Sequence, residues 1–444
     1  MPDAVILAPQ WIAPVAPDPR VLTGHAVLIE DGRIGALAPL DELRGSRPET
    51  PVQPLPGQLL VPGFVNLHSH AAMALLRGFA DDMPLHDWLR QRIWPAESKL
   101  VGPEFVRDGA LLAAAEMLLG GTTCFNDMYF FPEAAIEAAQ LLGMRSVHGI
   151  VVIDFASAYA AAPADYLRKG LELRDRFRHD PLVGFCLAPH APYTVSDESL
   201  QRVATLSREL GLPVHIHVHE TNAEIDESMA IHGKRPLERL EALGLVGPEL
   251  IAVHAVHLDE AELQQLAARG VSVAHCPHSN LKLASGIAPT ARMLELGIRV
   301  GIGTDGSASN NRLDLLQEAR TAALLAKGSS GRAETWPAAR ILQSMTLDAA
   351  TALGLEDRIG SIEPGKRADL VAVDLSAPEL QPVFEPLAQL IHAAGREHVR
   401  HVWVDGKPVV QKRQLASEGA RQGLSEVVGR TSVWHNRLGE ILSG

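Results

Sequence analysis

Two histidines, His68 and His70, stand two positions apart at the end of an apolar run. Alternate residues of a strand project from the same face, so on a strand both imidazoles can bind one metal ion. Histidines at this spacing also occur by chance as surface pairs, which makes the pair alone a weak signal. Its place after Val61-Pro62-Gly63-Phe64, at the end of a predicted strand, favours a metal site.

Three alternating histidines, His215, His217 and His219, precede Glu220. On a continuous strand all three face one side, where a buried polar group without a partner costs about 1–3 kcal/mol. A structural hydrogen-bonding role is therefore the first interpretation for His215 and His219. Glu220 is either a solvated loop acid or, inside a pocket, a residue that shuttles protons.

Two further apolar runs end in residues that can do chemistry. His254 falls on a predicted strand and is preferred as a pocket residue to His257, three positions later. Asp305 ends another run, in Gly303-Thr304-Asp305-Gly306. Its alternative role is to cap the next helix, which aspartate does well, but Ser307–Asn311 already offers caps.

Three histidines and an aspartate are a ligand set that binds zinc or a similar divalent ion and leaves a position for water. The metal lowers the pKa of that water toward ~7, which gives a hydroxide nucleophile at neutral pH. Iron or manganese tolerates similar ligands, so the ligand types do not fix the metal.

Other catalytic patterns are missing from the sequence. His219-Glu220 is followed by Ala223 where the pattern H-E-x-x-H needs a histidine. No P-C-x-x-C accompanies an H-x-E, which excludes the fold of the nucleic-acid deaminases. A G-x-S-x-G elbow and a convincing phosphate loop are missing too. Metal-assisted hydrolysis is the chemistry that the remaining residues favour.

Eight short apolar runs must position these residues, and each precedes a polar loop and a helical pattern. Eight strand–helix units in about 300 residues predict an α/β fold, the (β/α)₈ TIM-type barrel, whose active site lies at the carboxyl ends of its strands. Gly and Ser in Lys327–Arg332 predict a flexible loop, and amphipathic stretches predict helices at Leu200–Leu210, Pro236–Leu243 and Glu260–Ala268. The eight runs are Leu60–Asn66, Thr122–Asn126, Ser146–Ile153, Leu182–Leu187, Pro213–Val218, Ile251–Ala255, Val271–Ala274 and Ile298–Ile302.

Both ends of the chain differ from its middle. Alternating strands with Asp-Gly turns occur at Ala26–Ile34 and Val402–Val410, and a further strand is predicted at Ala368–Asp374. We therefore predict one small β-sandwich domain built from both termini, residues 1–59 plus 366–444 with a C-terminal helical tail. The barrel is predicted to span residues 60–365.

The composition is that of an ordinary globular protein, with 46% hydrophobic and 21% charged residues. A net charge of -13 without a Lys/Arg block argues against a nucleic-acid partner. Three widely spaced cysteines, Cys124, Cys186 and Cys276, fit a reducing compartment. The amino terminus has no basic region before an apolar run, and Ala110–Leu119 is too short to cross a bilayer. A cytoplasmic enzyme that does not bind membranes is expected.

The sequence resembles the amidohydrolase superfamily, and more narrowly the 5′-methylthioadenosine/S-adenosylhomocysteine deaminases, which are close to the triazine chlorohydrolases. The resemblance covers nearly the whole chain, from Val61-Pro62-Gly63-Phe64-Val65-Asn66-Leu67-His68-Ser69-His70 to Pro364-Gly365-Lys366-Arg367-Ala368-Asp369-Leu370. It implies one zinc ion per chain, with another divalent ion as an alternative, held by His68, His70, His217 and Asp305. No lysine ends the fourth strand, so the carbamylated-lysine, two-metal variant is not expected.

The same resemblance assigns roles around the metal. It implies Glu220, His254 and Asp305 as catalytic residues, with Glu220 and Asp305 also in contact with the substrate. Further substrate contacts are implied for a pocket aromatic, a ribose-binding acid and a strand-four histidine, which are Trp88, Glu97 and His190.

The implied reaction is hydrolytic deamination of an adenine nucleoside (5′-methylthioadenosine, adenosine or S-adenosylhomocysteine) to the inosine analogue and ammonia. The alternatives are a hydrolase of another ring, such as guanine, 8-oxoguanine, cytosine or a triazine, and a non-catalytic protein on the same barrel. The complete ligand set argues against the last. One departure concerns the substrate tail: Val147–Asp154 lacks the arginine that relatives carry after strand three, which disfavours the charged homocysteine tail. A homo-oligomer is expected.

Overall fold

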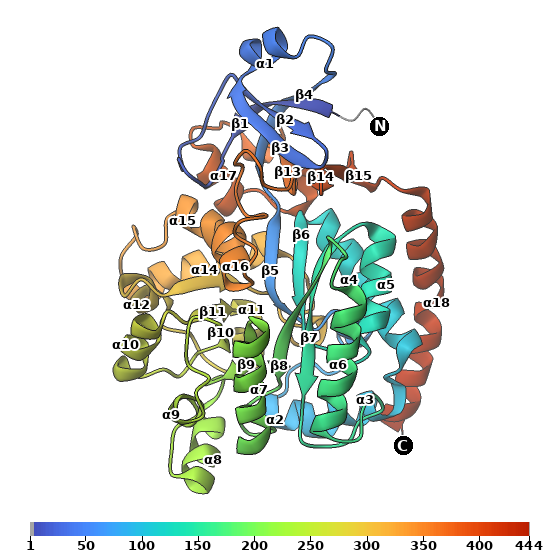
Figure 1. Ribbon diagram of the computed structural model, residues 1–444, viewed down its shortest axis with the longest axis vertical. Coiled ribbons are helices and arrows are strands. Elements are labelled where there is room, and N and C mark those ends of the chain that lie inside the picture. The colour runs from blue at the N-terminus through green and yellow to red at the C-terminus, as the bar shows by residue number, and fades with distance from the viewer. Residues whose placement is uncertain (1–3, 444) are drawn as a thin grey trace.

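A parallel barrel forms the centre of the molecule in the computed structural model, which describes residues 4–443 (Figure 1). Its eight strands are hydrogen-bonded in chain order. The amides of Thr304 and Asp305 donate to the carbonyl of His68 at 3.1 and 3.0 Å, which joins the last strand to the first. The strands are β5 (Phe64–Ser69), β6 (Thr122–Asp127), β7 (Arg145–Val152), β8 (Val183–Pro189), β9 (Val214–Val218), β10 (Leu250–His254), β11 (Ser272–His275) and β12 (Arg299–Ile302).

The eight predicted apolar runs all contribute strands to this barrel, which confirms the predicted fold class. Parallel strands covered on both faces read as continuous apolar runs, and β5, β6 and β7 are buried along their whole length. The first run differs in detail, because Leu60–Pro62 ends a strand of the terminal sheet and the barrel strand begins at Phe64.

Helices cover the outside of the barrel, as the fold requires. The three predicted helices are present as α7 (Asp197–Leu210), α9 (Pro236–Ala242) and α10 (Glu260–Arg269). Others are η1 (Ala71–Leu76), α2 (Leu85–Trp88), η2 (Leu89–Ile93), α3 (Trp94–Leu100), α4 (Pro103–Leu119), α5 (Pro132–Leu142), α6 (Pro163–Phe177), α8 (Asn222–His232), α11 (Pro277–Lys282), α12 (Thr290–Glu295), α13 (Ser307–Asn310), α14 (Leu315–Ser330), α15 (Ala338–Gln343), η3 (Ser344–Asp348), α16 (Ala349–Ala352) and α17 (Pro386–His392).

The loop predicted at Lys327–Arg332 was wrong over most of its length. Helix α14 continues to Ser330 and ends only at Gly331, whose φ of 67° is the left-handed conformation that glycine adopts readily. The Ser330 hydroxyl donates to the carbonyl of Ala326 at 2.7 Å. The serine side chain is therefore satisfied within the helix and does not end it.

Strands from both ends of the chain form one eight-stranded sheet, shown above the barrel in Figure 1. The predicted Asp-Gly turns are present, with φ of 50° and 75° at Asp31-Gly32 and 52° and 72° at Asp405-Gly406. In order the strands of the sheet are β16 (Gln414–Leu415), β15 (Lys407–Gln411), β14 (Val399–Val404), β13 (Leu370–Asp374), β4 (Val52–Pro62), β1 (Ala4–Ile12), β2 (His25–Glu30) and β3 (Arg33–Pro39). The sheet folds back on itself: the turn before β3 meets the segment before β13, where the amide of Ala368 donates to the carbonyl of Gly32 at 2.9 Å.

A buried ion pair joins this sheet to the amino ends of the barrel strands. Arg145, the first residue of β7, donates to both carboxylate oxygens of Asp369 at 2.8 and 3.0 Å. The Asp405 amide donates to the same carboxylate at 2.8 Å. The side chains of Arg145 and Asp369 are 3% and 1% exposed, so both charges are held entirely by protein groups. The boundaries predicted at 59/60 and 365/366 stay a prediction.

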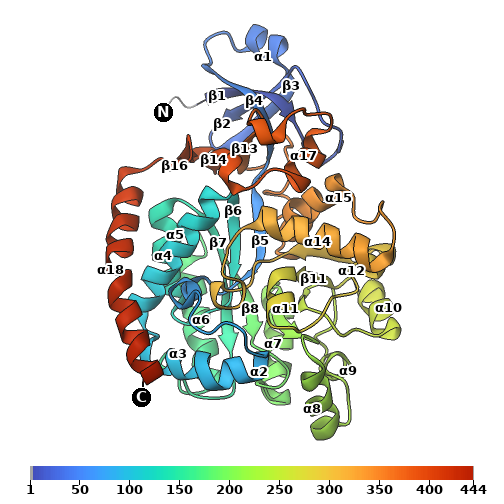
Figure 2. The ribbon, with the colours of Figure 1, turned by 180° about the vertical axis from the view of Figure 1, so that it is seen from behind.

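The C-terminal helix α18 (Glu418–Ser443) runs down one side of the barrel, across α5 and α4 toward α3 (Figures 1 and 2). Its anchor is the buried Asp108 of α4. This carboxylate accepts hydrogen bonds from Arg430 at 2.6 and 3.1 Å and from the indole of Trp434 at 3.1 Å. The end of the chain is thereby fixed to the first half of the barrel.

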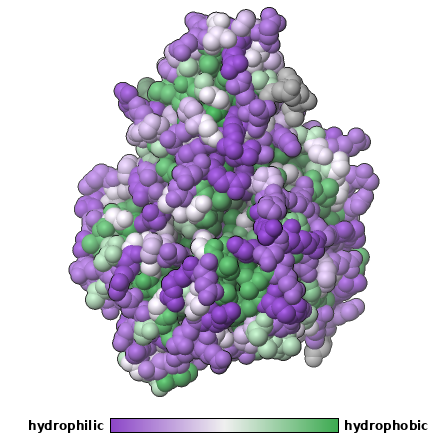
Figure 3. Space-filling model, in the orientation of Figure 1, coloured by the Kyte–Doolittle hydropathy of each residue, from purple (hydrophilic) through white to green (hydrophobic). Residues whose placement is uncertain are grey.

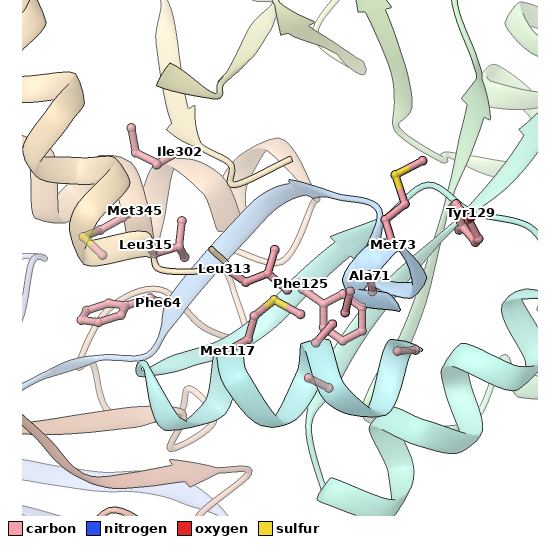
Figure 4. Packing of buried hydrophobic residues seen from close by; sticks show 14 of the residues in the cluster. Phe64, Ala71, Met73, Met117, Phe125, Tyr129, Ile302, Leu313, Leu315 and Met345 are labelled. Carbon is pink, nitrogen blue, oxygen red and sulfur yellow. The ribbon is translucent and has the colours of Figure 1, made fainter. Parts of the chain in front are cut away.

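Close packing of α4 places the segment that follows His70. A Cβ atom at Gly109 would lie 2.2 Å from the carbonyl oxygen of Ala72, so only glycine lets α4 approach η1 this closely. Met117 and Phe125 are fully buried between β5, β6 and α4, and Phe64 is fully buried at the start of β5, near Gly121 at the other end of α4 (Figure 4). The first metal-binding candidates therefore stand on tightly packed backbone.

The face drawn in Figure 3 is mainly hydrophilic, and its apolar residues form scattered patches over both the terminal sheet and the barrel. Within residues 4–443, no helix is both long enough and apolar enough to cross a membrane.

Candidate functional site

Four strands bring titratable side chains together at the carboxyl ends of the barrel. His68 lies at the end of β5, His217 on β9 and His254 at the end of β10. The backbone turns sharply there, with φ of 68° at His254 and 61° at Asp305. Such left-handed conformations are uncommon outside glycine and aspartate or asparagine and cluster at functional sites. Residues distant in sequence thus form one cluster.

The donor atoms in this cluster are spaced as zinc ligands are. The Nε2 of His68 lies 3.3 Å from the Nε2 of His217 and 3.2 Å from Oδ1 of Asp305. The Nε2 of His70 lies 3.3 Å from the same carboxylate oxygen. Zinc–ligand distances of about 2.0–2.1 Å with tetrahedral angles give edges of about 3.3 Å. These three separations match the edges of a tetrahedral site, and two trios of donor atoms that share His68 lie close together: His68 with His70 and Asp305, and His68 with His217 and His254.

In His70 and His217 the ring nitrogen Nδ1 is occupied by a hydrogen bond to a backbone carbonyl, and Nε2 is left to bind a metal ion. The Nδ1–H of His70 donates to the carbonyl of Met128 at 2.6 Å. That of His217 donates to the carbonyl of His190 at 2.7 Å. A carbonyl only accepts, so Nε2 keeps its lone pair when the ring is neutral. Burial lowers the pKa of His68 to about 4, which keeps its ring neutral at pH 7.

Asp305 is held by a ring of donors. Its Oδ2 accepts from the hydroxyls of Ser279 and Ser309 at 2.6 and 2.7 Å, and its Oδ1 accepts from the amide of Gly306 at 2.7 Å. The cap role considered for Asp305 is not the one seen, because the carboxylate faces His68 and His70. The carboxylate is therefore fixed next to the histidines.

Glu220 and His254 stand side by side next to these donors. The Nε2 of His254 lies 3.7 Å from Oε2 of Glu220, while its Nδ1–H donates to the side-chain oxygen of Asn280 at 2.7 Å. Burial raises the pKa of Glu220 above its ordinary value. Glu224 braces the segment, because its carboxylate accepts from the amides of His219 and Glu220 at 3.1 and 3.0 Å. Glu220 is thus a buried acid in a fixed position, as a proton donor must be.

A cavity of about 520 Å³ opens from the cluster. On its wall Glu97 accepts a 2.7 Å hydrogen bond from the hydroxyl of Tyr129. Burial raises the pKa of Glu97 to about 7, against the opposite effect of Tyr129 and His70. The walls are mainly apolar and aromatic, as in most ligand sites. They include Trp88, Leu89, Ile93, Trp94, Val101, Met128, Phe130, Ile153, Phe155, Tyr159, His190, Tyr193 and Leu283.

Every site residue predicted from the sequence lies at this cavity or its cluster. His70, Trp88, Glu97, His190, His217, Glu220, His254 and Asp305 line the cavity, and His68 lies directly behind them. The structural role expected of His215 is seen, because its Nε2 meets Nδ1 of His68 at 3.0 Å. His219 likewise makes structural bonds, to the carbonyl of His257 and the amide of Leu237, both at 3.1 Å.

Sequence reasoning missed the residues that position the others. Tyr129, Ser279, Asn280 and Tyr193 touch Glu97, Asp305, His254 and His190, respectively. A signal existed for all four, because each follows the carboxyl end of a barrel strand: Tyr129 follows β6, Tyr193 follows β8, and Ser279 and Asn280 follow β11. Their pairing with these partners carried no local signal, since Glu97 lies 32 positions from Tyr129 on another element.

Comparison with known proteins gives the family. The model of the amidohydrolase family matches residues 59–409. The chain belongs to the amidohydrolase family.

Individual relatives of this amidohydrolase agree with the predicted resemblance, which is confirmed. A protein of Teredinibacter turnerae named 5-methylthioadenosine/S-adenosylhomocysteine deaminase is 46% identical over 430 residues, covering 97% of this chain and 96% of the relative. The structure of an adenosine deaminase from Xanthomonas campestris with bound zinc is 46% identical, covers 98% of each chain and has a TM-score of 0.94. A variant of atrazine chlorohydrolase from Arthrobacter aurescens, complexed with zinc and atraton, is 25% identical with a TM-score of 0.89, covering 97% of this chain and 99% of that one.

Proposed function

We propose that this amidohydrolase is a zinc-dependent deaminase of adenine nucleosides. It would replace the amino group of the purine ring by oxygen and release ammonia. One observation carries the proposal: a cluster of histidines and an aspartate, with the buried acid Glu220 beside it, lines the same cavity as the hydrogen-bonded pair of Glu97 and Tyr129. The names of the relatives support the same activity.

The ligands proposed for the ion are His68, His70, His217 and Asp305. Three of the distances within this set, from His68 to His217, from His68 to Asp305 and from His70 to Asp305, are 3.2–3.3 Å and support it. His254 also lies close to His68 and His217, but its Nε2 lies 3.7 Å from Glu220, which suits contact with water or substrate better. Zinc bound here would supply a Lewis acid that lowers the pKa of water toward ~7.

The residues around the cluster can move the protons that deamination requires. Asp305 accepts a proton from the attacking water, and the Nε2 lone pair of His254 accepts a hydrogen bond from it. Glu220, whose pKa is raised by burial, would donate a proton to the ring nitrogen beside the reacting carbon. That carbon then accepts the water oxygen more readily.

Cleavage of the carbon–nitrogen bond completes the reaction and accounts for all the protons. The carbon–nitrogen bond breaks as the proton held by Asp305 passes to the amino group, which leaves as ammonia. Of the two water protons, one departs with ammonia and the other restores the proton that Glu220 gave to the ring. The protein therefore returns to its starting state.

Glu97 favours a nucleoside over a free base. A carboxylate can accept hydrogen bonds from two neighbouring hydroxyls, and bonds to charged groups contribute about 1.5–3 kcal/mol each. Glu97 and Tyr129 lie on the cavity wall beyond His70, where the ribose of a bound nucleoside would extend. Trp88 and His190 would line the space for the ring system.

A substrate panel tests the proposal. The zinc-loaded protein should release ammonia from adenosine and 5′-methylthioadenosine, with the absorption change of adenine becoming hypoxanthine, and should act poorly on adenine, guanine and cytosine. Ammonia release from one of these free bases, but from no adenine nucleoside, would contradict it.

A further inference from the structure

We propose that His215 is a positioning residue of the metal site, because its ring accepts the hydrogen bond that holds His68 in the tautomer that binds zinc. The inference rests on the proposed function and its ligand set, and it adds a residue that is not itself a ligand. The Nδ1 of His68 meets the Nε2 of His215 at 3.0 Å. Both side chains are fully buried.

The three proposed histidine ligands differ in what holds their second ring nitrogen. His70 and His217 donate Nδ1–H to backbone carbonyls at 2.6 and 2.7 Å. His68 faces another imidazole instead. A carbonyl oxygen always accepts, whereas an imidazole nitrogen accepts only when the proton lies on the other nitrogen of its ring. Of the three ligands, His68 alone therefore depends on the tautomer of a neighbouring side chain.

The need for a bare Nε2 on His68 fixes the tautomers of both rings. A neutral imidazole carries one proton, and burial favours the neutral form. Zinc requires the lone pair on Nε2 of His68, which places the proton of this ring on Nδ1, where it points at His215. The Nε2 of His215 must then be without a proton, and the proton of that ring lies on its Nδ1. The two rings can serve a metal ion in this combination of tautomers and in no other.

The other tautomer of His68 competes with the metal. The Nε2 of His68 lies 3.2 Å from Oδ1 of Asp305. A proton on this Nε2 would be donated to the carboxylate and would occupy both atoms at which the ion is expected. If Nδ1 had no acceptor, this tautomer would be favoured, because a buried N–H without an acceptor costs stability. The acceptor on His215 removes that penalty from the zinc-binding tautomer.

The surroundings of His215 give its ring no other role. Ile251 lies beside it on β10 and belongs to an apolar cluster formed by residues of several barrel strands. Within the described part of the chain, the Nδ1 of His215 has no hydrogen-bond partner. A leucine here would bury no unpaired nitrogen, so packing alone does not account for a histidine at this position. The bond to His68 does account for it.

The expected consequence is a change in zinc affinity. A hydrogen-bond partner of a metal-binding histidine orients the ring and makes its other nitrogen a better ligand, and losing such a partner typically lowers metal affinity by about 10–100-fold. We therefore expect His215→Leu to raise the dissociation constant of zinc by about 10–100-fold. Competition between the metal-free protein and a chelator of known zinc affinity measures this constant without reference to activity.

His148→Leu is the matched control. His148 is also a barrel-strand histidine, 1% exposed, with one ring nitrogen 2.8 Å from the hydroxyl of Ser146 and the other without a partner among the described residues. Its ring lies near those of Phe125 and Phe185, at centroid distances of 5.9 and 6.4 Å. Removing it should leave the dissociation constant of zinc at the wild-type value.

His215→Gln tests whether the acceptor itself matters. The side-chain oxygen of glutamine also accepts hydrogen bonds, so this variant should keep most of the zinc affinity that His215→Leu loses. A loss as large as that of His215→Leu would assign the effect to packing and overturn the inference.

Nitrogen NMR of the histidine rings gives a test on the unaltered, zinc-loaded protein. The ring of His215 should carry its proton on Nδ1 and none on Nε2, and its signals are identified by their loss in His215→Gln. A proton on Nε2 of His215 would overturn the inference even if no leucine variant folded.

The outcomes separate this inference from the proposed function. Equal zinc affinity in His215→Leu and the wild type would overturn the role of His215 and leave the function standing, as would an equal loss in His148→Leu. A wild-type chain that binds no zinc would overturn the ligand set and, with it, the proposed function.

Discussion

The polar side chains at the two ends of the barrel differ in whether their hydrogen-bonding groups are all satisfied within the protein. At the carboxyl ends, His70 and His217 use one ring nitrogen for a backbone carbonyl and turn the other toward the cavity. At the amino ends, Arg145 and Asp369 satisfy each other and are closed off from solvent.

The difference separates what stabilises this protein from what it can do. A polar group that is fully partnered inside the protein fixes structure, whereas one with a free donor or acceptor costs stability and can bind something else. Carboxyl ends of barrel strands hold function and amino ends hold stability in this fold generally. Changes at the two ends should therefore affect different measurements.

The largest effect should come from removing a proposed metal ligand. His217→Ala should remove the zinc and lower kcat by at least about 10⁴-fold, because the several kcal/mol that a bound metal supplies are lost. Elemental analysis and ammonia release measure the two losses. His435→Ala, at an exposed histidine of α18, should change neither. Two tightly held ions per wild-type chain would contradict the single site.

Glu220→Gln should lower kcat by about 10²–10⁴-fold, the usual size of positioned proton transfer. The amide keeps the shape of the side chain but has no acid proton to give. The zinc content should stay at one ion per chain, so the variant separates proton transfer from metal binding. A Glu220→Gln protein with full zinc and near-normal kcat would exclude Glu220 as the proton donor.

Breaking the pair at the other end should affect stability instead of catalysis. Arg145→Met leaves Asp369 buried without its partner, which typically costs about 3–5 kcal/mol. Denaturant unfolding should show this loss, while kcat per folded molecule stays at the wild-type value. Arg292→Met, in the exposed pair with Glu260, is the matched control and should leave the unfolding midpoint unchanged. An Arg145→Met protein with normal stability but low kcat would contradict the assignment of stability to the amino ends of the barrel strands.

The smallest effect is expected at Glu97, on the cavity wall. Glu97→Gln should lower kcat/KM for adenosine by about 10–100-fold through weaker hydroxyl hydrogen bonds, but should hardly change it for 2′,3′-dideoxyadenosine. Burial raises the pKa of Glu97 to about 7, so the carboxylate becomes protonated as the pH falls from 8 to 6.

The wild-type preference for adenosine over the dideoxy compound should therefore decline with acidification. In the Glu97→Gln variant it should be flat over the same range. An equally steep decline in both proteins would assign the titration to a different group.

The barrel could be predicted because each of its strands is marked by residues that are neighbours in the sequence. Each strand is a run of apolar residues and each reactive residue stands at the end of one, as Asp305 does after Arg299–Ile302. The Asp-Gly turns of the terminal sheet are equally local, since two residues determine the turn.

What the sequence did not reveal is set by tertiary contacts. The hydrogen bond between Tyr129 and Glu97, and the hydroxyls that hold Asp305, join residues from different elements. The loop predicted at Lys327–Arg332 failed for a related reason. The Ser330 hydroxyl donates to the carbonyl of Ala326 within the helix. The glycine and serine content of the segment therefore predicted a loop where the chain is mostly helical.

The order in which the chain is made has a consequence for the terminal sheet. Strand β4, at residues 52–62, pairs on one side with β13, at residues 370–374, and the anchor of α18 on Asp108 comes from Arg430 and Trp434. Contacts so distant in sequence close slowly, and an unpaired strand edge invites association with other chains. During synthesis β4 keeps one open edge until nearly the whole protein has left the ribosome. The segment made last completes both the sheet and the outer wall of the half-barrel made first.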